Sequence, residues 1–188
     1  MNPYHRAFVD VLHTLDNAAR KAGRPDVPRL VAVSKTRTAG EVATLAELVQ
    51  KAFGENYVQE AAGKIAALAG RGLEWHLIGH LQSNKAREAA RDFDWVQSVD
   101  RPGLASALAR HRPDGLPPLN VLLQVNIDDE ASKHGCGPGD IQALAEAVAA
   151  EPRLALRGLM AIPAPQTDPE RRRPAFALYS LLTAAAIG

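Results

Sequence analysis

The chain has little of several features that mark particular protein classes. Its one cysteine, Cys136, excludes an internal disulfide and is typical of a reducing compartment. No apolar run approaches the ~18 residues that a membrane span requires, and the first residues contain no apolar segment typical of a secretory signal. The net charge of +1 lacks the positive excess of proteins that bind nucleic acid or anionic membranes. We therefore expect a cytoplasmic protein that binds neither nucleic acid nor membrane. We also expect a monomer, although none of these features bears on the oligomeric state.

The chain does contain enough apolar material for one folded domain. Of its 188 residues, 46% are hydrophobic and 23% are charged, which fits a soluble domain with a sizeable core. Strands are expected at residues 30–36, 52–56, 73–79, 95–99, 120–126 and 154–162. A helix is expected at residues 3–22 and after each strand, the last one starting near residue 168.

This alternation of strands and helices with short connections predicts an α/β fold with a parallel sheet. The sheet could be an open doubly wound one or a closed (β/α) barrel. No G-x-G-x-x-G motif follows the first strand, which argues against the open dinucleotide-binding fold. Only six strands are counted, whereas a complete barrel has eight and usually needs ~250 residues.

Local signals predict where individual helices begin. Thr38 starts a Thr-x-x-Glu capping box, which should begin the helix after the first strand. Ser83 or Asn84 is the expected N-cap of the helix after the third strand, and Asp100 that of the helix after the fourth. Pro138 suits the first turn of the helix after the fifth strand.

Lys35 stands at the carboxyl end of the first strand, where it shares a face with Val31 and Val33. Both faces of this strand are apolar until its last residues, which predicts burial on both sides. Folds of this class place their chemistry at the carboxyl ends of strands. Partial burial favours a neutral amine, a nucleophile that forms an imine with an aldehyde. The alternative is a lysine whose stem packs while its amine reaches water.

In a barrel the strand ends share one rim, so their polar side chains converge. Besides Lys35, this rim would collect Asn56, His76, Met160 and the turn at Ser83. Each has a simpler interpretation: Asn56 can satisfy a loop, His76 can be a hydrogen-bonded core residue and Met160 can fill the core.

Two further basic residues have weaker signals. Lys133, in a loop after the fifth strand, is most simply a solvated cation. His76 and His80 have the spacing of a helical metal pair, but they lie on a strand and a turn, and the glutamate of that motif is missing. We therefore predict no metal site.

Four segments, in order along the chain, carry a resemblance to a known family. Residues 31–36, 53–60, 75–85 and 156–163 read VAVSKT, FGENYVQE, WHLIGHLQSNK and LRGLMAIP. Together they closely resemble the pyridoxal phosphate homeostasis proteins, the YggS/PROSC family, from the first helix to about residue 165. The resemblance implies one (β/α) barrel domain over residues 1–188, similar to the N-terminal domain of bacterial alanine racemase, with six of eight strands present and the C-terminal part missing.

The resemblance also implies a cofactor, pyridoxal 5'-phosphate, held as a Schiff base on Lys35. Asn56, His76 and Met160 match strand-end positions of the cofactor pocket, and Lys133 matches a lysine near its mouth. The candidate cofactor-binding residues are therefore Lys35, Asn56, His76, Ser83, Lys133 and Met160. The family continues with a Ser-x-Gly-Met-Ser-x-Asp motif and a later Arg-x-Gly segment that hold the phosphate and the ring nitrogen, and this chain contains neither.

Three functions are compatible with these residues. The first is a protein that binds pyridoxal phosphate, takes part in vitamin B6 and amino-acid homeostasis and passes the cofactor to apo-enzymes without turnover. The second is a pyridoxal phosphate-dependent amino-acid racemase, and the third is a barrel that binds a phosphorylated metabolite without an imine. A racemase needs a second acid or base, which a tyrosine from a second domain supplies in similar racemases. The tyrosines here, Tyr4, Tyr57 and Tyr179, lie in no added domain, which favours binding without a catalytic residue.

Overall fold

The structure is a computed structural model that describes residues 2–127, 134–164, 167, 168, 170, 173, 174, 176–180 and 182. Six strands form one sheet in chain order, and each pairs in parallel with the next. They are β1 (Ala32–Val33), β2 (Ala52–Glu55), β3 (Glu74–Leu77), β4 (Trp95–Val99), β5 (Leu119–Gln124) and β6 (Leu154–Met160).

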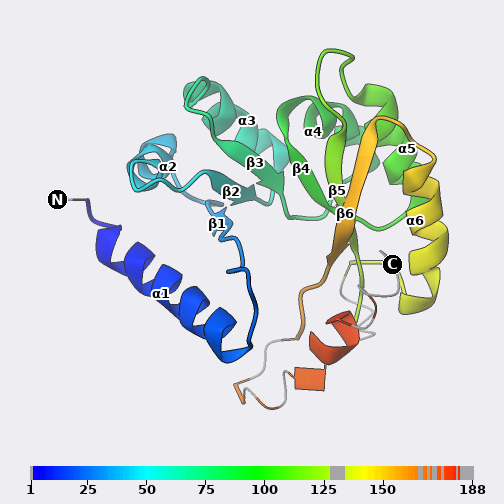
Figure 1. Cartoon of the computed structure of the whole chain (residues 1–188). Coiled ribbons are helices and arrows are strands. Elements are labelled where there is room, and N and C mark those ends of the chain that lie inside the picture. The colour runs from blue at the N-terminus through cyan, green and yellow to red at the C-terminus, as the bar shows by residue number, and fades with distance from the viewer. Residues whose placement is uncertain are drawn as a thin grey trace.

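Helices follow the strands and cover one face of the sheet (Figure 1). They are α2 (Ala39–Ala46), α3 (Val58–Ala67), α4 (Ala86–Asp92), α5 (Pro102–His111) and α6 (Ile141–Ala149), with α1 (His5–Lys21) preceding β1. The predicted α/β fold with six parallel strands is confirmed. Within the described residues β1 and β6 are the two edges of the sheet, so these six strands form part of a barrel.

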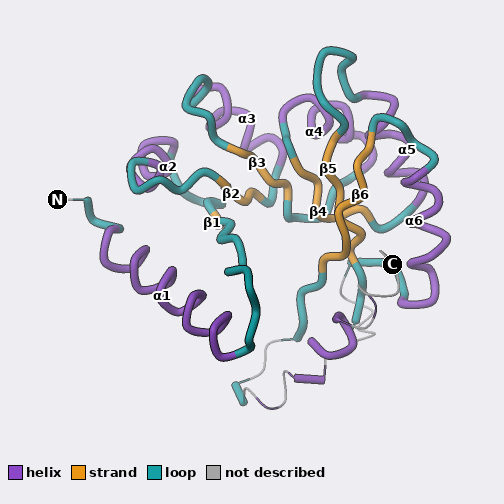
Figure 2. Tube along the Cα trace, in the orientation of Figure 1, coloured by secondary structure: helices purple, strands orange, loops and turns teal. Residues whose placement is uncertain are grey.

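The main core lies between the sheet and its helices. Phe53, Leu77 and Val96 on the strands are fully buried against helical residues such as Ala61 and Leu104. Helix α1 stands away from the other helices beside β1 (Figure 2). Its start is attached to α2, because the Asn2 side-chain amide donates a hydrogen bond to the Thr44 carbonyl at 2.6 Å. In the described part of the chain, no helix combines the length and the apolar character needed to cross a membrane.

One of the predicted helix starts is confirmed. Thr38 and Glu41 form the capping box, with the Glu41 amide donating to the Thr38 hydroxyl and the Glu41 carboxylate accepting from the Thr38 amide. Pro138 begins a short 3-10 turn, Pro138–Asp140, and α6 starts only at Ile141.

Two predicted caps were wrong. Ser83 and Asn84 lie in a 3-10 turn, Ser83–Lys85, and α4 begins after it without a side-chain cap. Asp100 does not cap α5, because Arg101 is the N-cap residue and the Asp100 carboxylate instead pairs with the Arg101 guanidinium at 2.6 Å.

The first strand is much shorter than predicted. Residues 30–36 were expected to be buried on both faces, but β1 comprises two residues, and Val33 is 54% exposed. The reason is that β1 is an edge strand, paired only with β2 in the described sheet, so its inner face lacks a covering neighbour. The predicted last helix lies partly outside the described residues, although residues 176–180 are helical and the Tyr179 hydroxyl donates to the Leu159 carbonyl at 2.6 Å.

Candidate functional site

The carboxyl ends of the strands surround a cavity of about 390 Å³. Its polar lining residues are Lys35, Asn56, His80, Gln124, Asn126 and His134. They come from segments that follow β1, β2, β3 and β5, and from the end of β5 itself, which matches the convergence expected at a barrel rim.

The strand register explains which predicted residues meet. Val33 pairs with Gly54, and Gly54 pairs with His76, so these residues lie in one layer across the sheet. Side chains on one face of a strand recur every second residue, so Lys35 and Asn56 lie one layer closer to the rim than His76. The structure therefore brings Lys35 and Asn56 together at the cavity.

His76 lies below this cavity and is not among the residues that line it. It is 3% exposed, and its ring nitrogens lie 2.6 Å from a Glu74 carboxylate oxygen and 2.9 Å from the Gln97 amide nitrogen. The ring stacks on Trp95 at a centroid distance of 5.3 Å. Burial lowers the pKa of His76, against the opposing effect of the Glu74 carboxylate. These contacts are those of a hydrogen-bonded inner residue, the simpler of the two interpretations above.

Ser83 and Met160 also lie outside the cavity lining. Ser83 is exposed in the turn after β3, where its hydroxyl accepts a hydrogen bond from Arg101 at 3.0 Å. Met160 ends β6 and is half-buried, and its carbonyl accepts from the Val125 amide at 2.9 Å. Lys133 lies outside the described residues.

Lys35 itself is exposed, so the partial burial expected from sequence is not found. Within the described part of the chain its amine forms no ion pair. The side chain lines the cavity without a charged partner among the described residues, while the backbone on either side of it is held by other residues.

A buried polar network lies beneath Lys35, on the side of the sheet that faces α3. Glu55 is fully buried on β2, and Lys64 on α3 is 7% exposed. The Lys64 amine contacts the two Glu55 carboxylate oxygens at 2.9 and 3.1 Å and donates to the Ser34 carbonyl at 2.9 Å. The Ser34 hydroxyl donates to Glu55 at 2.6 Å, so all three side chains are satisfied.

Glu60 connects this network to the residue after Lys35. Its carboxylate accepts from the Lys64 amine at 2.8 Å and from the Thr36 backbone amide at 2.7 Å. Hydrogen bonds from Lys64 and then from Thr36 hold the pKa of Glu60 below its usual range. Burial acts to lower the pKa of Lys64, but hydrogen bonds and charge from Glu60 and Glu55 outweigh burial and raise that pKa.

This network was not predicted from the sequence. One signal was available: Glu55 is a charged residue at the end of a short apolar strand, and a charge in a buried position needs a partner. Glu60 and Lys64 have the i, i+4 spacing of an ordinary surface pair on a helix, so nothing in their spacing indicated that Lys64 is the partner of Glu55.

Glycine at position 79 allows the ends of β2 and β3 to approach closely beside the cavity. A Cβ atom there would lie 2.3 Å from the Asn56 carbonyl oxygen and 2.8 Å from the Asn56 Cα. Any larger residue would therefore displace the backbone that carries Asn56.

Two histidines, His80 and His134, stack against each other in the lining of the Lys35 cavity. The rings of His80 and His134 stack at a centroid distance of 3.7 Å, and His80 Nδ1 lies 3.7 Å from an Asp100 carboxylate oxygen. Burial, followed by the charge of His134, lowers the pKa of His80. The ligand-type atoms of the three residues lie within 4.8 Å of one another. The rings are nearly parallel, however, so their lone pairs lie in parallel planes and do not converge on one point.

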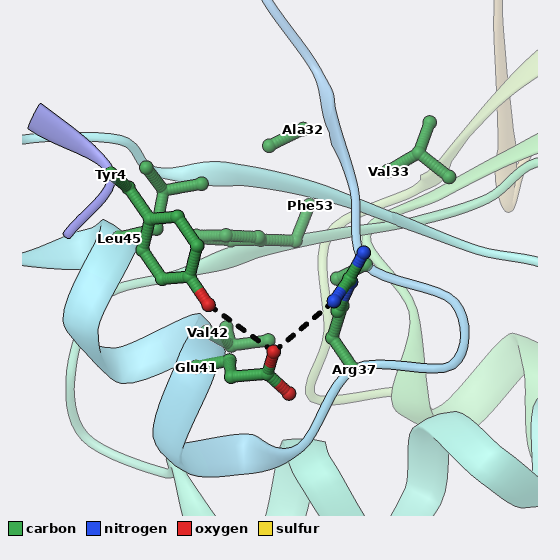
Figure 3. A pocket seen from close by; sticks show the side chains of 9 residues that line it. Tyr4, Ala32, Val33, Arg37, Glu41, Val42, Leu45 and Phe53 are labelled. Carbon is green, nitrogen blue, oxygen red and sulfur yellow. Dashed lines mark hydrogen bonds and ion pairs between the residues drawn. The ribbon is translucent and has the colours of Figure 1, made fainter. Parts of the chain in front are cut away.

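A smaller cavity of about 210 Å³ lies between the start of α1, β1 and α2 (Figure 3). Glu41 occupies its polar side and accepts from the Tyr4 hydroxyl at 3.2 Å and from Arg37 at 3.4 Å. The Thr38 amide, and then the Thr38 hydroxyl, lower the pKa of Glu41 to about 2. The acidic group in this cavity is therefore already engaged by contacts within the chain.

Comparison with known proteins identifies the family of this chain. Residues 10–186 match the family described as alanine racemase, N-terminal domain. The pyridoxal phosphate homeostasis protein of Pseudomonas aeruginosa is 55% identical over 161 residues, which cover 85% of this chain and 70% of that protein. The protein of the same name from Escherichia coli K12 is 49% identical over 172 residues, which cover 89% of this chain and 74% of that protein. The chain belongs to the pyridoxal phosphate homeostasis protein family.

A solved structure of a similar protein supports the assignment. PipY of Synechococcus elongatus, solved with pyridoxal phosphate bound, is 34% identical and aligns with a TM-score of 0.73 over 90% of this chain and 81% of its own. Alanine racemase of Corynebacterium glutamicum, at 17% identity and a TM-score of 0.65 over 84% of this chain, shares the fold. The family and the fold predicted from the four sequence segments are confirmed.

Proposed function

We propose that this member of the pyridoxal phosphate homeostasis protein family binds pyridoxal 5'-phosphate through Lys35 and acts in vitamin B6 and amino-acid homeostasis without turnover. One observation carries the proposal: a lysine with no ion-pair partner among the described residues stands at the carboxyl end of β1, on the wall of a cavity that Asn56 also lines. The names of the relatives and the cofactor bound to PipY support it.

The residues present fit the aldehyde and ring of this cofactor. A cavity of about 390 Å³ is in the size range of small-ligand sites, and it offers an amine beside amide groups. When bound, the cofactor supplies an aldehyde carbon that condenses with a neutral lysine amine and releases water. Lys35 would hold that carbon, and Asn56 would orient the ring by hydrogen bonds. The described lining residues include no arginine, so we assign the phosphate contact to none of them.

The surroundings of Lys35 favour binding over turnover. Proton transfer at a substrate carbon requires an acid or base held within hydrogen-bond reach, and in similar racemases a tyrosine supplies it. None of the three tyrosines lines the Lys35 cavity in the described part of the chain: Tyr4 contacts Glu41, Tyr57 is 65% exposed and Tyr179 is bonded to the Leu159 carbonyl. The amine is exposed, so water reaches it, and an open site protects a reactive carbanion poorly.

The proposal includes a cytoplasmic, monomeric protein that passes the cofactor to apo-enzymes. The single cysteine supports a reducing compartment, and an exposed lysine on an open cavity supports release of the cofactor to a second protein.

Absorbance titration with pyridoxal phosphate tests the proposal. We expect a band near the visible edge in the parent protein, its loss in Lys35→Ala and its retention in the matched control Lys51→Ala. Borohydride reduction followed by peptide mass mapping should place the adduct on Lys35. An adduct mainly on another lysine would overturn the assignment.

A second measurement separates carrier from racemase. We expect transfer of the cofactor to an apo-enzyme, and no exchange of the alanine α-proton in deuterated water above the rate with free pyridoxal phosphate. Exchange that is faster than this and is lost in Lys35→Ala would support the racemase.

A further inference from the structure

We infer that Glu60, acting with the buried Glu55–Lys64 pair, is a positioning residue that fixes the direction of Lys35 toward the cavity. The inference deepens the proposed function and rests on it for its consequence on cofactor binding. Its structural part, that Glu60 sets the conformation of the turn carrying Lys35, concerns the chain alone.

The two residues that follow β1, Ser34 and Lys35, have different surroundings. Ser34 is 5% exposed and faces the Glu55–Lys64 pair, whereas Lys35 lines the cavity. Both residues follow β1, and their side chains point to opposite sides of the sheet, Ser34 toward the Glu55–Lys64 pair and Lys35 toward the cavity. Holding Ser34 on one face therefore determines which way Lys35 projects on the other.

Lys35 lies in a tight turn. The Arg37 amide donates to the Ser34 carbonyl at 3.0 Å, which closes a four-residue turn with Lys35 and Thr36 at its centre. Thr36 has φ of 63°, in the left-handed region. A positive φ at this third position is what a type II turn has, and glycine or asparagine usually supplies it. For a β-branched residue this conformation is unfavourable, so contacts outside the turn have to hold it.

Glu60 and Lys64 supply those contacts. Glu60 accepts from the Thr36 amide at 2.7 Å, and Lys64 donates to the Ser34 carbonyl at 2.9 Å. The backbone on both sides of Lys35 is thus bound by side chains of one helix, α3. Glu60 and Lys64 are themselves joined at 2.8 Å, and Glu55 holds Lys64 from β2, so the turn is tied to both elements.

Glu60 is the residue with which to test this arrangement, because it is partly exposed whereas Glu55 is fully buried. Glu60→Ala removes the acceptor of the Thr36 amide and leaves the Glu55–Lys64 pair in place. Glu60→Gln keeps an acceptor oxygen and should therefore retain the hydrogen bond to the Thr36 amide. Glu88→Ala is the matched control, because Glu88 also lies in the first turn of a helix and pairs with a lysine, Lys85, at 3.8 Å.

Two readouts are needed, one of which requires no cofactor. Hydrogen exchange at the Thr36 amide should become about tenfold faster in Glu60→Ala and stay near the parent rate in Glu60→Gln and Glu88→Ala. The affinity for pyridoxal phosphate, measured by absorbance titration, should fall about tenfold in Glu60→Ala alone. Thermal unfolding of each variant establishes that it is folded at the assay temperature.

The outcomes separate this inference from the proposed function. Unchanged Thr36 exchange in Glu60→Ala overturns the inference whether or not the cofactor binds. Faster exchange with unchanged affinity also overturns it, because a turn that moves without consequence does not position Lys35. If the parent protein forms no adduct on Lys35, the proposed function fails, and the exchange measurement still decides whether Glu60 sets the turn.

Discussion

Replacing Gly79 by alanine should destabilise the protein and distort the cavity. The added Cβ would lie 2.3 Å from the Asn56 carbonyl oxygen, 2.8 Å from its Cα and 2.9 Å from its carbonyl carbon. All three contacts are with backbone, which cannot rotate aside as the end of a side chain can. The strands would have to separate, and overpacking of this kind costs about 1–3 kcal/mol of the free energy of unfolding.

The matched control is Gly63→Ala on α3, where an added Cβ meets nothing within 4 Å. Alanine is a better helix former than glycine by up to about 1 kcal/mol, so this variant should be as stable as the parent or more stable. Urea unfolding followed by the fluorescence of Trp75 and Trp95 measures both changes on one scale.

The same chemical change should therefore have opposite effects on stability at positions 79 and 63. A Gly79→Ala protein that unfolds at the parent's urea midpoint or above would refute this expectation, because the contact with Asn56 would then be relieved at no cost. Since Asn56 lines the Lys35 cavity, we also expect weaker binding of pyridoxal phosphate in Gly79→Ala than in Gly63→Ala.

Three further predictions concern stability. Thr38→Ala removes the hydroxyl of the capping box at α2 and should lower the free energy of unfolding by about 1 kcal/mol in urea titration; no loss would show that the cap contributes nothing. Lys64→Met leaves the fully buried Glu55 carboxylate without its partner and should cost about 3–5 kcal/mol by the same assay, more than the exposed-site control Lys51→Met. Burial lowers the pKa of His76 below 6.5, so as the pH falls through that value only the unfolded chain takes up this proton, and stability decreases. Urea midpoints measured from about pH 8 to about pH 5 check this, and an equal pH slope in a folded His76→Gln variant would contradict it.

The sequence predicted best what local patterns control. The strand at Trp95–Val99 and the capping box at Thr38 appear as expected, because alternation and capping depend on residues close together in the chain. The predicted caps at Ser83 and Asp100 were wrong because Arg101 donates hydrogen bonds to both side chains. Arg101 is the direct neighbour of Asp100 but lies 18 residues from Ser83, and cap preferences alone indicate neither contact.

In the candidate site, too, some positions were predicted from the sequence and others were not. Lys35 and Asn56 meet because each follows a strand and neighbouring parallel strands end at one edge. His76 was expected there too, but the pairing of Gly54 with His76 places it one layer deeper, and register between strands is not encoded in either strand alone. The Glu55–Lys64 pair depends on the packing of α3 against β2. The contact between the two residues therefore could not be predicted from the sequence.

Ser34 and Lys35 point to opposite faces of the sheet, and this has a consequence for natural and engineered variants of α3. In the sequence, Glu60 and Lys64 have the i, i+4 spacing of an ordinary surface pair, so a substitution at either would not be expected to affect a ligand. Because these side chains form hydrogen bonds with the backbone on either side of Lys35, such a substitution would affect the reactivity of Lys35 on the opposite face of the sheet. Substitutions on α3 could therefore change the position of the Lys35 amine without replacing any residue that lines the cavity.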